Sequence, residues 1–147
     1  MEDAVLYTIG FTKKNAEIFF NILKKNKVQT VFDIRLNNVS QLAGFTKRDD
    51  LRYFLKTMCD CKYEHKPEWA PTEEILNEYK KNNGSWRDYE VAFSALINRR
   101  KIENGVSLGS LAHGCLLCSE PTPEQCHRRL VAEYFKQTIP SLRIVHL

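Results

Sequence analysis

The sequence contains no apolar run that approaches the roughly 18 residues needed to span a membrane. Its first residues, Met-Glu-Asp-Ala-Val, carry no basic stretch of the kind that opens a signal peptide. It also has no internal repeat, no low-complexity segment and no domain boundary. These absences predict a single cytoplasmic domain over residues 1–147 that binds no membrane, with one core that buries roughly two-thirds of the unfolded surface.

A strong excess of charge is also missing, because the formal net charge is only +4. The apolar share of 43% and the charged share of 27% are typical of a globular protein. The basic residues are expected on solvated helix faces, and they would bind nucleic acid only if folding gathered them into one patch. These residues form short clusters at Lys13-Lys14, Lys24-Lys25, Lys47-Arg48, Lys80-Lys81 and Arg99-Arg100-Lys101.

Disulfides are not expected either. The chain has five cysteines, an odd number, and no secretory signal. Reduced thiols are therefore expected rather than a disulfide framework.

Strand-like and helix-like segments alternate along the whole chain. Apolar and β-rich runs predict strands at residues 5–11, 28–35, 62–65, 115–120 and 142–147. Apolar spacing and N-cap residues predict helices at 13–26, 47–57, 72–81 and 85–103, capped at Thr12, Thr72 and Ser85, while residues 36–45 predict a loop. This order predicts an α/β fold: a single three-layer domain with a mostly parallel central sheet and helices on both faces.

Another helix is predicted directly after residues 115–120. Thr122 is expected as its N-cap, with Pro123 at the first helical position and Gln125 closing a capping box.

The helical wheel of this segment gives one continuous apolar arc. His127 lies in the middle of the arc and is expected to point toward the sheet, whereas Arg128 lies at its edge and Arg129 in solvent. The apolar members of the arc are Cys126, Leu130, Val131, Tyr134 and Phe135.

Polar groups follow the ends of several predicted strands. Gly10 ends the first strand, where a turn often needs a positive φ or a close backbone approach to a ligand. Asp33 and Arg35 share a face of the second, either as a local ion pair or as part of a ligand site. We expect the first, second and fourth strands to be near neighbours, with Gly10, Arg35 and Glu120 at one edge. With the helix N-terminus at Cys126, this edge favours an anion.

A zinc site is the first alternative, because Cys115, Cys118, Cys126 and His127 superficially supply a Cys₃His ligand set. Residues three apart on a strand point to opposite faces, and adjacent helical residues diverge by about 100°. We therefore expect no metal, and the sequence indicates no other cofactor.

A cysteine nucleophile is the second alternative, with Cys118 at the strand end or Cys126 at the helix N-terminus, where the dipole lowers a thiol pKa. Cys126 lies on the apolar arc, so a buried structural thiol is the commoner explanation for it. His127 is open to the same two interpretations, although its place in the first turn near Glu120 favours a functional role.

Leu116-Leu117-Cys118-Ser119-Glu120, followed by Cys126-His127-Arg128, is similar to the signature Leu-Leu-Cys-x-Glu…Cys-His-Arg of the DUF488 family, an uncharacterised family of small α/β proteins. Thr8-Ile9-Gly10 resembles the family's opening Thr-Ile-Gly, and Asp33-Ile34-Arg35 its Asp-Val-Arg. Tyr63 with His65-Lys66-Pro67-Glu68 resembles its central Tyr…His…Pro-Glu. The resemblance spans nearly the whole chain and implies an α/β fold, but no reaction.

The chain departs from the family pattern in three places. Phe11-Thr12 stands where the family usually has His-Ser, and the segment ending at Gln41 replaces a loop rich in proline and arginine. The family's Gly-Gly after Pro-Glu is replaced near Ala70-Pro71. Roles that depend on these groups are not carried over.

Two functions from different classes follow. The first is an enzyme acting on a phosphate-bearing or other anionic substrate, such as a nucleotide or nucleic acid. The second is a non-catalytic module that binds nucleic acid or protein through its lysine pairs and through Trp69 and Trp86. One concave pocket lined by the predicted groups favours the enzyme, whereas a flat basic stripe favours the module. The candidate catalytic residues are His127, Glu120, Cys118 and Asp33, and the candidate anion-binding residues are Gly10, Arg35, Cys126 and Arg128.

Overall fold

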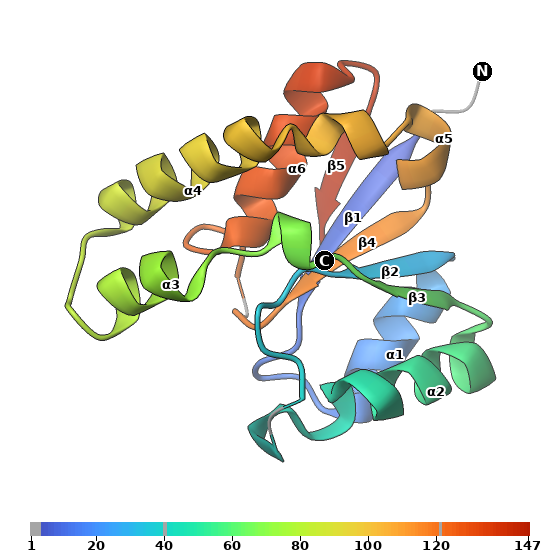
Figure 1. The fold of residues 1–147 in the computed structure, drawn as a ribbon. Helices are drawn as coiled ribbons and strands as arrows, with labels where there is room; N and C mark the ends of the chain where they lie inside the picture. Colours follow the sequence, from blue (N-terminus) through green and yellow to red (C-terminus); the bar gives the residue numbers. More distant parts are fainter. Residues whose placement is uncertain (1–3, 40, 121) are drawn as a thin grey trace.

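Strands and helices alternate in the computed structural model, which describes residues 4–39, 41–120 and 122–147 (Figure 1). The strands are β1 Val5–Gly10, β2 Thr30–Asp33, β3 Lys62–His65, β4 Gly114–Cys118 and β5 Arg143–His146. The α-helices are α1 Ala16–Lys25, α2 Arg48–Cys59, α3 Glu73–Lys80, α4 Trp86–Arg100, α5 Leu108–Leu111 and α6 His127–Thr138. Short 3₁₀ segments lie at η1 Gln41–Thr46, η2 Pro67–Trp69 and η3 Ile102–Gly105.

The strands form one parallel sheet in the order β3-β2-β4-β1-β5. Strand β4 lies between β1 and β2, and it is buried along its whole length. The predicted neighbours are therefore confirmed: Gly10 pairs with Cys118 in register, so the ends of β1 and β4 lie together. The carboxyl ends of three central strands thus meet at one edge.

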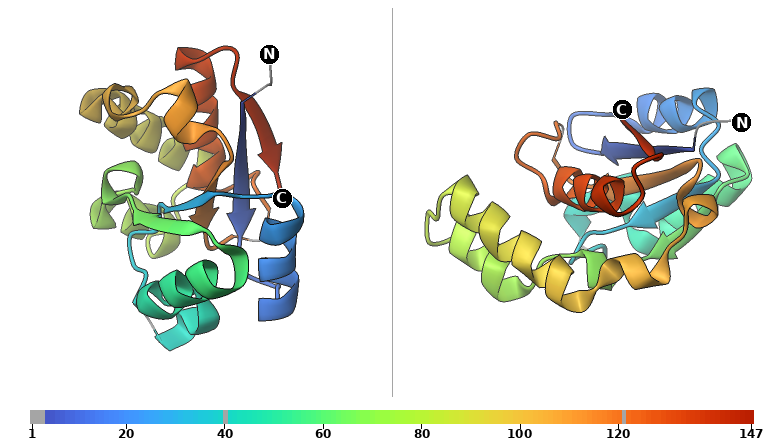
Figure 2. Two further views of the ribbon diagram at one scale, coloured as in Figure 1. Left: turned by 90° about the vertical axis from the view of Figure 1, so that its right-hand side faces the viewer. Right: turned by 90° about the horizontal axis from the view of Figure 1, so that it is seen from above.

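Helices cover both faces of the sheet and complete the three layers (Figure 2). Helices α1 and α2 pack on one face, where Cys115 and Leu117 contribute to the core. Helices α4 and α6 pack on the other, where Leu116 and Cys118 contribute. The alternation of adjacent residues between the two cores follows from the two-residue period of a strand.

Trp69 belongs to the second core. Its ring packs 5.4 Å from Phe32 and 4.9 Å from Phe135 between centroids, and only 3% of the residue is exposed. The expectation of an exposed Trp69 is therefore wrong, because η2 turns this residue under the α4–α6 layer.

The start of α6 is the main departure from the predicted secondary structure. The helix begins at His127, and Cys126 is its N-cap without a side-chain capping bond. The expected helix start at Thr122 and Pro123 is wrong, as is the capping box with Gln125. Residues 122–126 form a turn instead, since they connect the end of β4 to a helix whose first side chains reach β1 and β2.

Other boundaries differ for local reasons. Asn15 rather than Thr12 caps α1, because its Oδ1 accepts a hydrogen bond from the Ile18 N–H at 2.8 Å. The predicted N-caps Thr72 and Ser85 are confirmed. Helix α4 ends at Arg100, where Lys101 takes a left-handed conformation with φ of 53°.

The predicted loop at residues 36–45 includes the start of η1, and the connection at 105–114 contains α5. Expectations that depend on residues 1–3, 40 and 121 lie outside the described residues. No helix in the described part of the chain is long and apolar enough to cross a membrane.

Candidate functional site

A cavity of about 290 Å³ lies at the carboxyl ends of β2 and β4. Its walls come from these strand ends, the turn before α6, the first residue of α6, and helices α3 and α4. The predicted site residues among its lining are Arg35, Cys118, Glu120, Cys126 and His127. Of the other three, Asp33 and Arg128 are buried beside the cavity and Gly10 lies at the end of β1.

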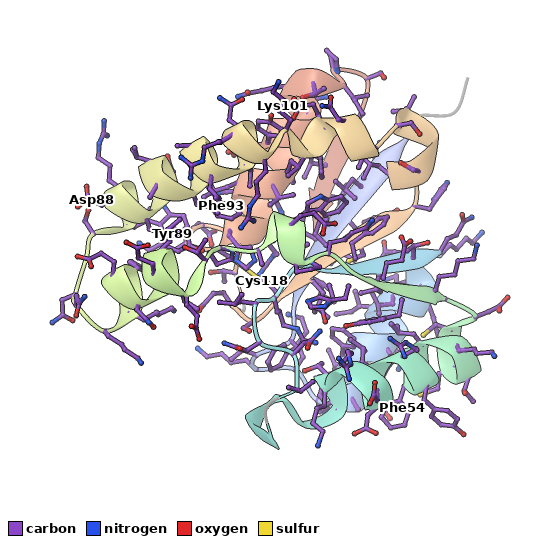
Figure 3. The ribbon with its side chains drawn as sticks, in the orientation of Figure 1. Phe54, Asp88, Tyr89, Phe93, Lys101 and Cys118 are labelled. Carbon is purple, nitrogen blue, oxygen red and sulfur yellow. A yellow bond between two sulfur atoms is a disulfide. The ribbon has the colours of Figure 1, made fainter. Side chains whose placement is uncertain are left out.

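An aromatic wall, formed by Tyr79, Trp86 and Tyr89, closes one side of this cavity. The rings of Trp86 and Tyr89 are stacked, with centroids 5.0 Å apart, and Tyr79 lies 5.1 Å from Tyr89. The series continues through Phe93, which packs edge-on against His127 at 5.5 Å. Figure 3 shows Tyr89 and Phe93 on the side of α4 that faces the end of β4, where Cys118 lies.

Arg35 makes its polar contacts with protein groups rather than with the cavity. Its Nε and Nη2 donate to the two carboxylate oxygens of Asp33, each at 2.8 Å. Its Nη1 and Nη2 also donate to the hydroxyl and the carbonyl of Thr46, at 3.1 and 2.6 Å. Only 3% of Arg35 is exposed. The structure therefore forms the local ion pair that was one of the two sequence-based interpretations, and the guanidinium holds η1 against β2.

Asp33 is the hub of this buried network. Its carboxylate also accepts hydrogen bonds from the Tyr63 hydroxyl at 2.6 Å and from Asn38 Nδ2 at 3.3 Å. Burial opposes the charged form of Asp33, but the hydrogen bonds and charge of Arg35 outweigh it, so the pKa of this carboxyl is lowered. Asp33 does not line the cavity.

His127 points toward the sheet, as predicted. Its Nε2 lies 2.6 Å from the carbonyl oxygen of Ile34, and because a carbonyl only accepts, Nε2 carries the proton. Burial of the imidazole lowers its pKa to about 4. The ring is therefore neutral near pH 7, and Nδ1 is left as a hydrogen-bond acceptor in a residue that lines the cavity.

Arg128 is completely buried, with an exposed fraction of 0%. This burial is more complete than its expected position at the edge of the apolar arc suggests, because the side chain lies between α6 and β1. Nε donates to Thr8 Oγ1 at 3.2 Å, and Nη1 donates to the Glu120 carbonyl at 2.5 Å and to Cys118 Sγ at 3.1 Å. Nη2 has no partner among the described residues.

Arg129 is less exposed than expected, at 25% of its side chain, since it pairs with Glu90 and Glu133.

Gly10 is close to protein backbone rather than to open space. A Cβ added there would lie 1.6 Å from the Glu120 carbonyl oxygen and 2.8 Å from Arg128 Nη1. Gly10 has no positive φ. The close backbone approach predicted for this position is thus made by the chain itself. The Glu120 carboxylate lies on the outer side of the turn, 3.0 Å from Lys80 Nζ.

Cys118 and Cys126 are joined by a disulfide in the structure. The expectation of reduced thiols is wrong for this pair, because the turn of residues 122–125 brings the N-cap of α6 back over the end of β4. Their Cα atoms are 7.5 Å apart, longer than the roughly 4.4–6.8 Å usual for a disulfide. Cys59, Cys61 and Cys115 are free.

Metal ligation finds no support in the described residues, where no group of three or more His, Cys, Asp or Glu side chains is placed to hold a metal ion. Cys115 points to the opposite face from Cys118, as the strand period predicts. The expected absence of bound zinc stays a prediction.

The aromatic wall is what sequence reasoning missed. Of its three residues, only Trp86 was expected to bind a ligand, and that was as part of a non-catalytic binding module. The available signal was the spacing of Trp86, Tyr89 and Phe93 at i, i+3 and i+7, which places three rings on one side of α4. That this side meets a strand end depends on tertiary packing.

Among known proteins, a family model described as a domain of unknown function, DUF488, matches residues 15–135. No curated protein matches the chain, and neither does any solved structure. The match runs from α1 into α6 and includes every candidate site residue except Gly10. The chain therefore belongs to the DUF488 family.

Proposed function

We propose that the cavity binds a nucleotide and that the protein is an enzyme acting on it. The observation that carries the proposal is a concave cavity that combines an aromatic wall with five predicted polar groups at the carboxyl edge of the sheet. Open parallel sheets commonly bind ligands in this crevice. A concave site is also the feature that favours an enzyme over the alternative, a binding module with a flat basic surface.

The aromatic wall supports the choice of a ring-bearing ligand. A nucleobase lying against Trp86 and Tyr79 would gain about 1–3 kcal/mol from stacking. The amides of Asn37 and Gln125 also line the cavity and can hydrogen bond to the polar edge of a base. A volume of about 290 Å³ lies at the lower end of the usual range for ligand sites. It suits a base and sugar with the phosphate at the mouth.

Lys80 is the cation that supports an anionic substituent. It lines the cavity, and its side chain is 52% exposed. Its ion pair with Glu120 is exposed on both sides and so contributes little to stability. A phosphate could therefore replace Glu120 as the partner of Lys80, whereas Arg35 would have to abandon Asp33.

The catalytic assignment uses three groups that line the cavity. Cys118 Sγ, in contact with the Arg128 guanidinium, would be the nucleophile once reduced. The Glu120 carboxylate would transfer protons, and neutral His127 would accept a hydrogen bond through Nδ1 rather than act as an acid. In the reducing cytoplasm, where we expect the protein, the Cys118 thiol would be free.

Tryptophan fluorescence can test binding, because Trp86 lies in the wall and the other tryptophan, Trp69, is buried in the core. In a Trp69→Phe variant, nucleotides should change the emission of Trp86, nucleosides should do so more weakly, and inorganic phosphate alone should not. Lys80→Ala should remove the preference for nucleotides over nucleosides. Trp86→Ala, followed by thermal shift, should weaken nucleotide binding between about fivefold and a hundredfold.

Tyr53→Ala is the matched control, since Tyr53 is an aromatic residue of α2 that is 63% exposed and does not line the cavity. It should leave nucleotide binding unchanged. If no nucleoside or nucleotide changes the emission of Trp86 or the melting temperature of the wild type, the nucleotide proposal is wrong. Equal binding of inorganic phosphate and nucleotide would likewise refute the role of the aromatic wall.

A further inference from the structure

Arg128 is a buried cation whose charge no carboxylate neutralises directly. None of the ion pairs among residues 4–39, 41–120 and 122–147 includes it. Cys115, Glu120 and Glu124 act on it only through longer-range charge interactions. Burying a charge without a paired ion is costly. Such an arrangement strongly favours an anion on any acidic group in contact with the guanidinium.

Cys118 is the acidic group in that position. Arg128 Nη1 lies 3.1 Å from Cys118 Sγ, and the other groups that accept hydrogen bonds from this guanidinium, the Thr8 hydroxyl and the Glu120 carbonyl, are neutral. A hydrogen bond from a cation favours the thiolate over the thiol. Lys14 is a second cation at this end of β1. Its Nζ donates to the Gly10 carbonyl at 2.9 Å, and its charge interacts with that of Arg128.

Cys126 supplies the second sulfur. It is the N-cap of α6, a helix of twelve residues, where the helix dipole also favours a thiolate. Its Sγ is in contact with Cys118 Sγ, and both residues line the cavity. Cys118 is fully buried and Cys126 is 3% exposed, so the cavity is the side from which a small solute would reach the pair.

The remaining cysteines provide an internal comparison, because Arg128 acts on Cys115 only through its charge, whereas it donates a hydrogen bond to Cys118. Burial raises the pKa of Cys59 and Cys115, and raises that of Cys61 to about 12. None of the three forms a disulfide or lines the cavity.

We infer that Cys118 and Cys126 are a redox-active dithiol that exchanges reversibly with low-molecular-weight disulfides, with Arg128 as the positioning residue that holds Cys118 as a thiolate. One protein thiolate attacks a sulfur of a glutathione-type disulfide, forming a mixed disulfide and releasing one small thiolate. The second protein thiolate attacks the protein sulfur of that mixed disulfide and releases the other. The two cysteines lose two electrons and two protons, and one small disulfide becomes two small thiols.

This exchange requires no nucleotide. It would make the proposed enzyme activity sensitive to redox state, because oxidation removes the Cys118 nucleophile. The two ideas fail separately: redox exchange is measured without nucleotide, and nucleotide binding is measured in the reduced protein.

The test starts from the fully reduced full-length chain, incubated with oxidised glutathione and then alkylated under denaturing conditions. Intact-mass and peptide analysis should show that the wild type loses two hydrogens at Cys118 and Cys126. It should retain the three alkylatable thiols of Cys59, Cys61 and Cys115. A Cys126→Ser variant should instead accumulate a single glutathione adduct on Cys118, because the resolving thiol is gone.

The role of Arg128 is tested by the pH profile of the adduct rate in the Cys126→Ser background. Half-maximal rate is expected at about pH 7 or below, against about 8.5 for an ordinary thiol. Adding Arg128→Met keeps the apolar stem but removes the charge. It should move the profile toward the ordinary value and slow the reaction at least about tenfold near neutral pH. Arg128→Lys should restore most of the rate, which a purely structural role would not predict.

Several outcomes would overturn the inference. One is a wild type whose five thiols are all recovered after incubation, and another is an adduct spread equally over Cys59 and Cys118. If Arg128→Met folds and keeps the rate and pH profile of its parent, Arg128 has no part in the reaction. If it does not fold, a profile centred near pH 8.5, that of an ordinary thiol, in Cys126→Ser alone refutes the thiolate.

Discussion

Replacing Gly10 by alanine should destabilise the protein more than a methyl group usually does. The added Cβ would lie 1.6 Å from the Glu120 carbonyl oxygen and 2.6 Å from its carbon, whereas real Cβ atoms essentially never approach closer than 3.0 Å. The end of β1 and the chain after β4 would therefore have to separate by more than 1 Å. Both are backbone segments, so no flexible side chain can move aside.

The cost can be worked out from what this separation disturbs. Phe11 N–H donates to the Cys118 carbonyl at 3.3 Å, and Thr12 N–H donates to the Ser119 carbonyl at 3.1 Å, so both bonds join the segments that must part. Overpacking costs about 1–3 kcal/mol, and each lost hydrogen bond costs about 1 kcal/mol. We expect Gly10→Ala to lose at least about 3 kcal/mol. That corresponds to a fall in melting temperature of roughly 10 °C for a chain of this size.

Urea denaturation and calorimetry would measure the change, with Gly105→Ala as the matched control. A Cβ at Gly105 meets nothing within 4 Å, and this residue has no positive φ. The control should change stability by less than about 1 kcal/mol, in the stabilising direction, because alanine restricts the unfolded chain. If Gly10→Ala is within 1 kcal/mol of the control, the close approach of β1 to Glu120 is wrong, and the geometry around Arg128 with it.

Three further predictions concern the buried polar groups. Burial gives His127 a folded-state pKa of about 4, below its unfolded value near 6.5. The free energy of unfolding should therefore fall by up to about 1.4 kcal/mol per pH unit as the pH falls between these values. His127→Gln should remove that part of the slope in urea titrations, and an unchanged slope would contradict the prediction. Arg35→Ala should cost about 3–5 kcal/mol, because it leaves Asp33 buried without its cation, and exposed Arg87→Ala should cost almost nothing in the same denaturation assay. Elemental analysis of protein purified without chelators should find no stoichiometric zinc, and one zinc per chain that disappears in Cys118→Ser would show that the metal prediction is wrong.

The α/β class and most elements can be predicted from the sequence because their signals are local. Residues 62–65 were expected as a strand and form β3 at those positions. Thr72 and Ser85 cap α3 and α4 because their side chains bond backbone groups only three residues away. The adjacency of β1, β2 and β4 in the sheet can also be predicted, since alternating strands and helices favour parallel pairing.

Local signals failed where distant groups competed with them. The Thr122 capping motif is present in the sequence, yet the helix begins at His127. The later start lets His127 reach the Ile34 carbonyl and Arg128 reach Thr8 and Cys118, contacts between residues up to 120 positions apart. The helix is therefore four residues shorter at its start than predicted, and the hydrogen bonds formed instead cannot be predicted from a pattern over a few residues.

The sequence likewise predicts only part of the chemistry of the candidate site. The sequence alone determined which residue types stand at the strand ends, and hence that Arg35, Glu120, Cys118 and His127 would gather at one edge of a parallel sheet. Only the tertiary structure decided their charges and partners. Arg35 is held by Asp33, whereas Arg128 is buried against the Cys118 sulfur with no carboxylate beside it. Charge and burial depend on what the folded chain places within a few ångströms, which neither spacing nor composition specifies.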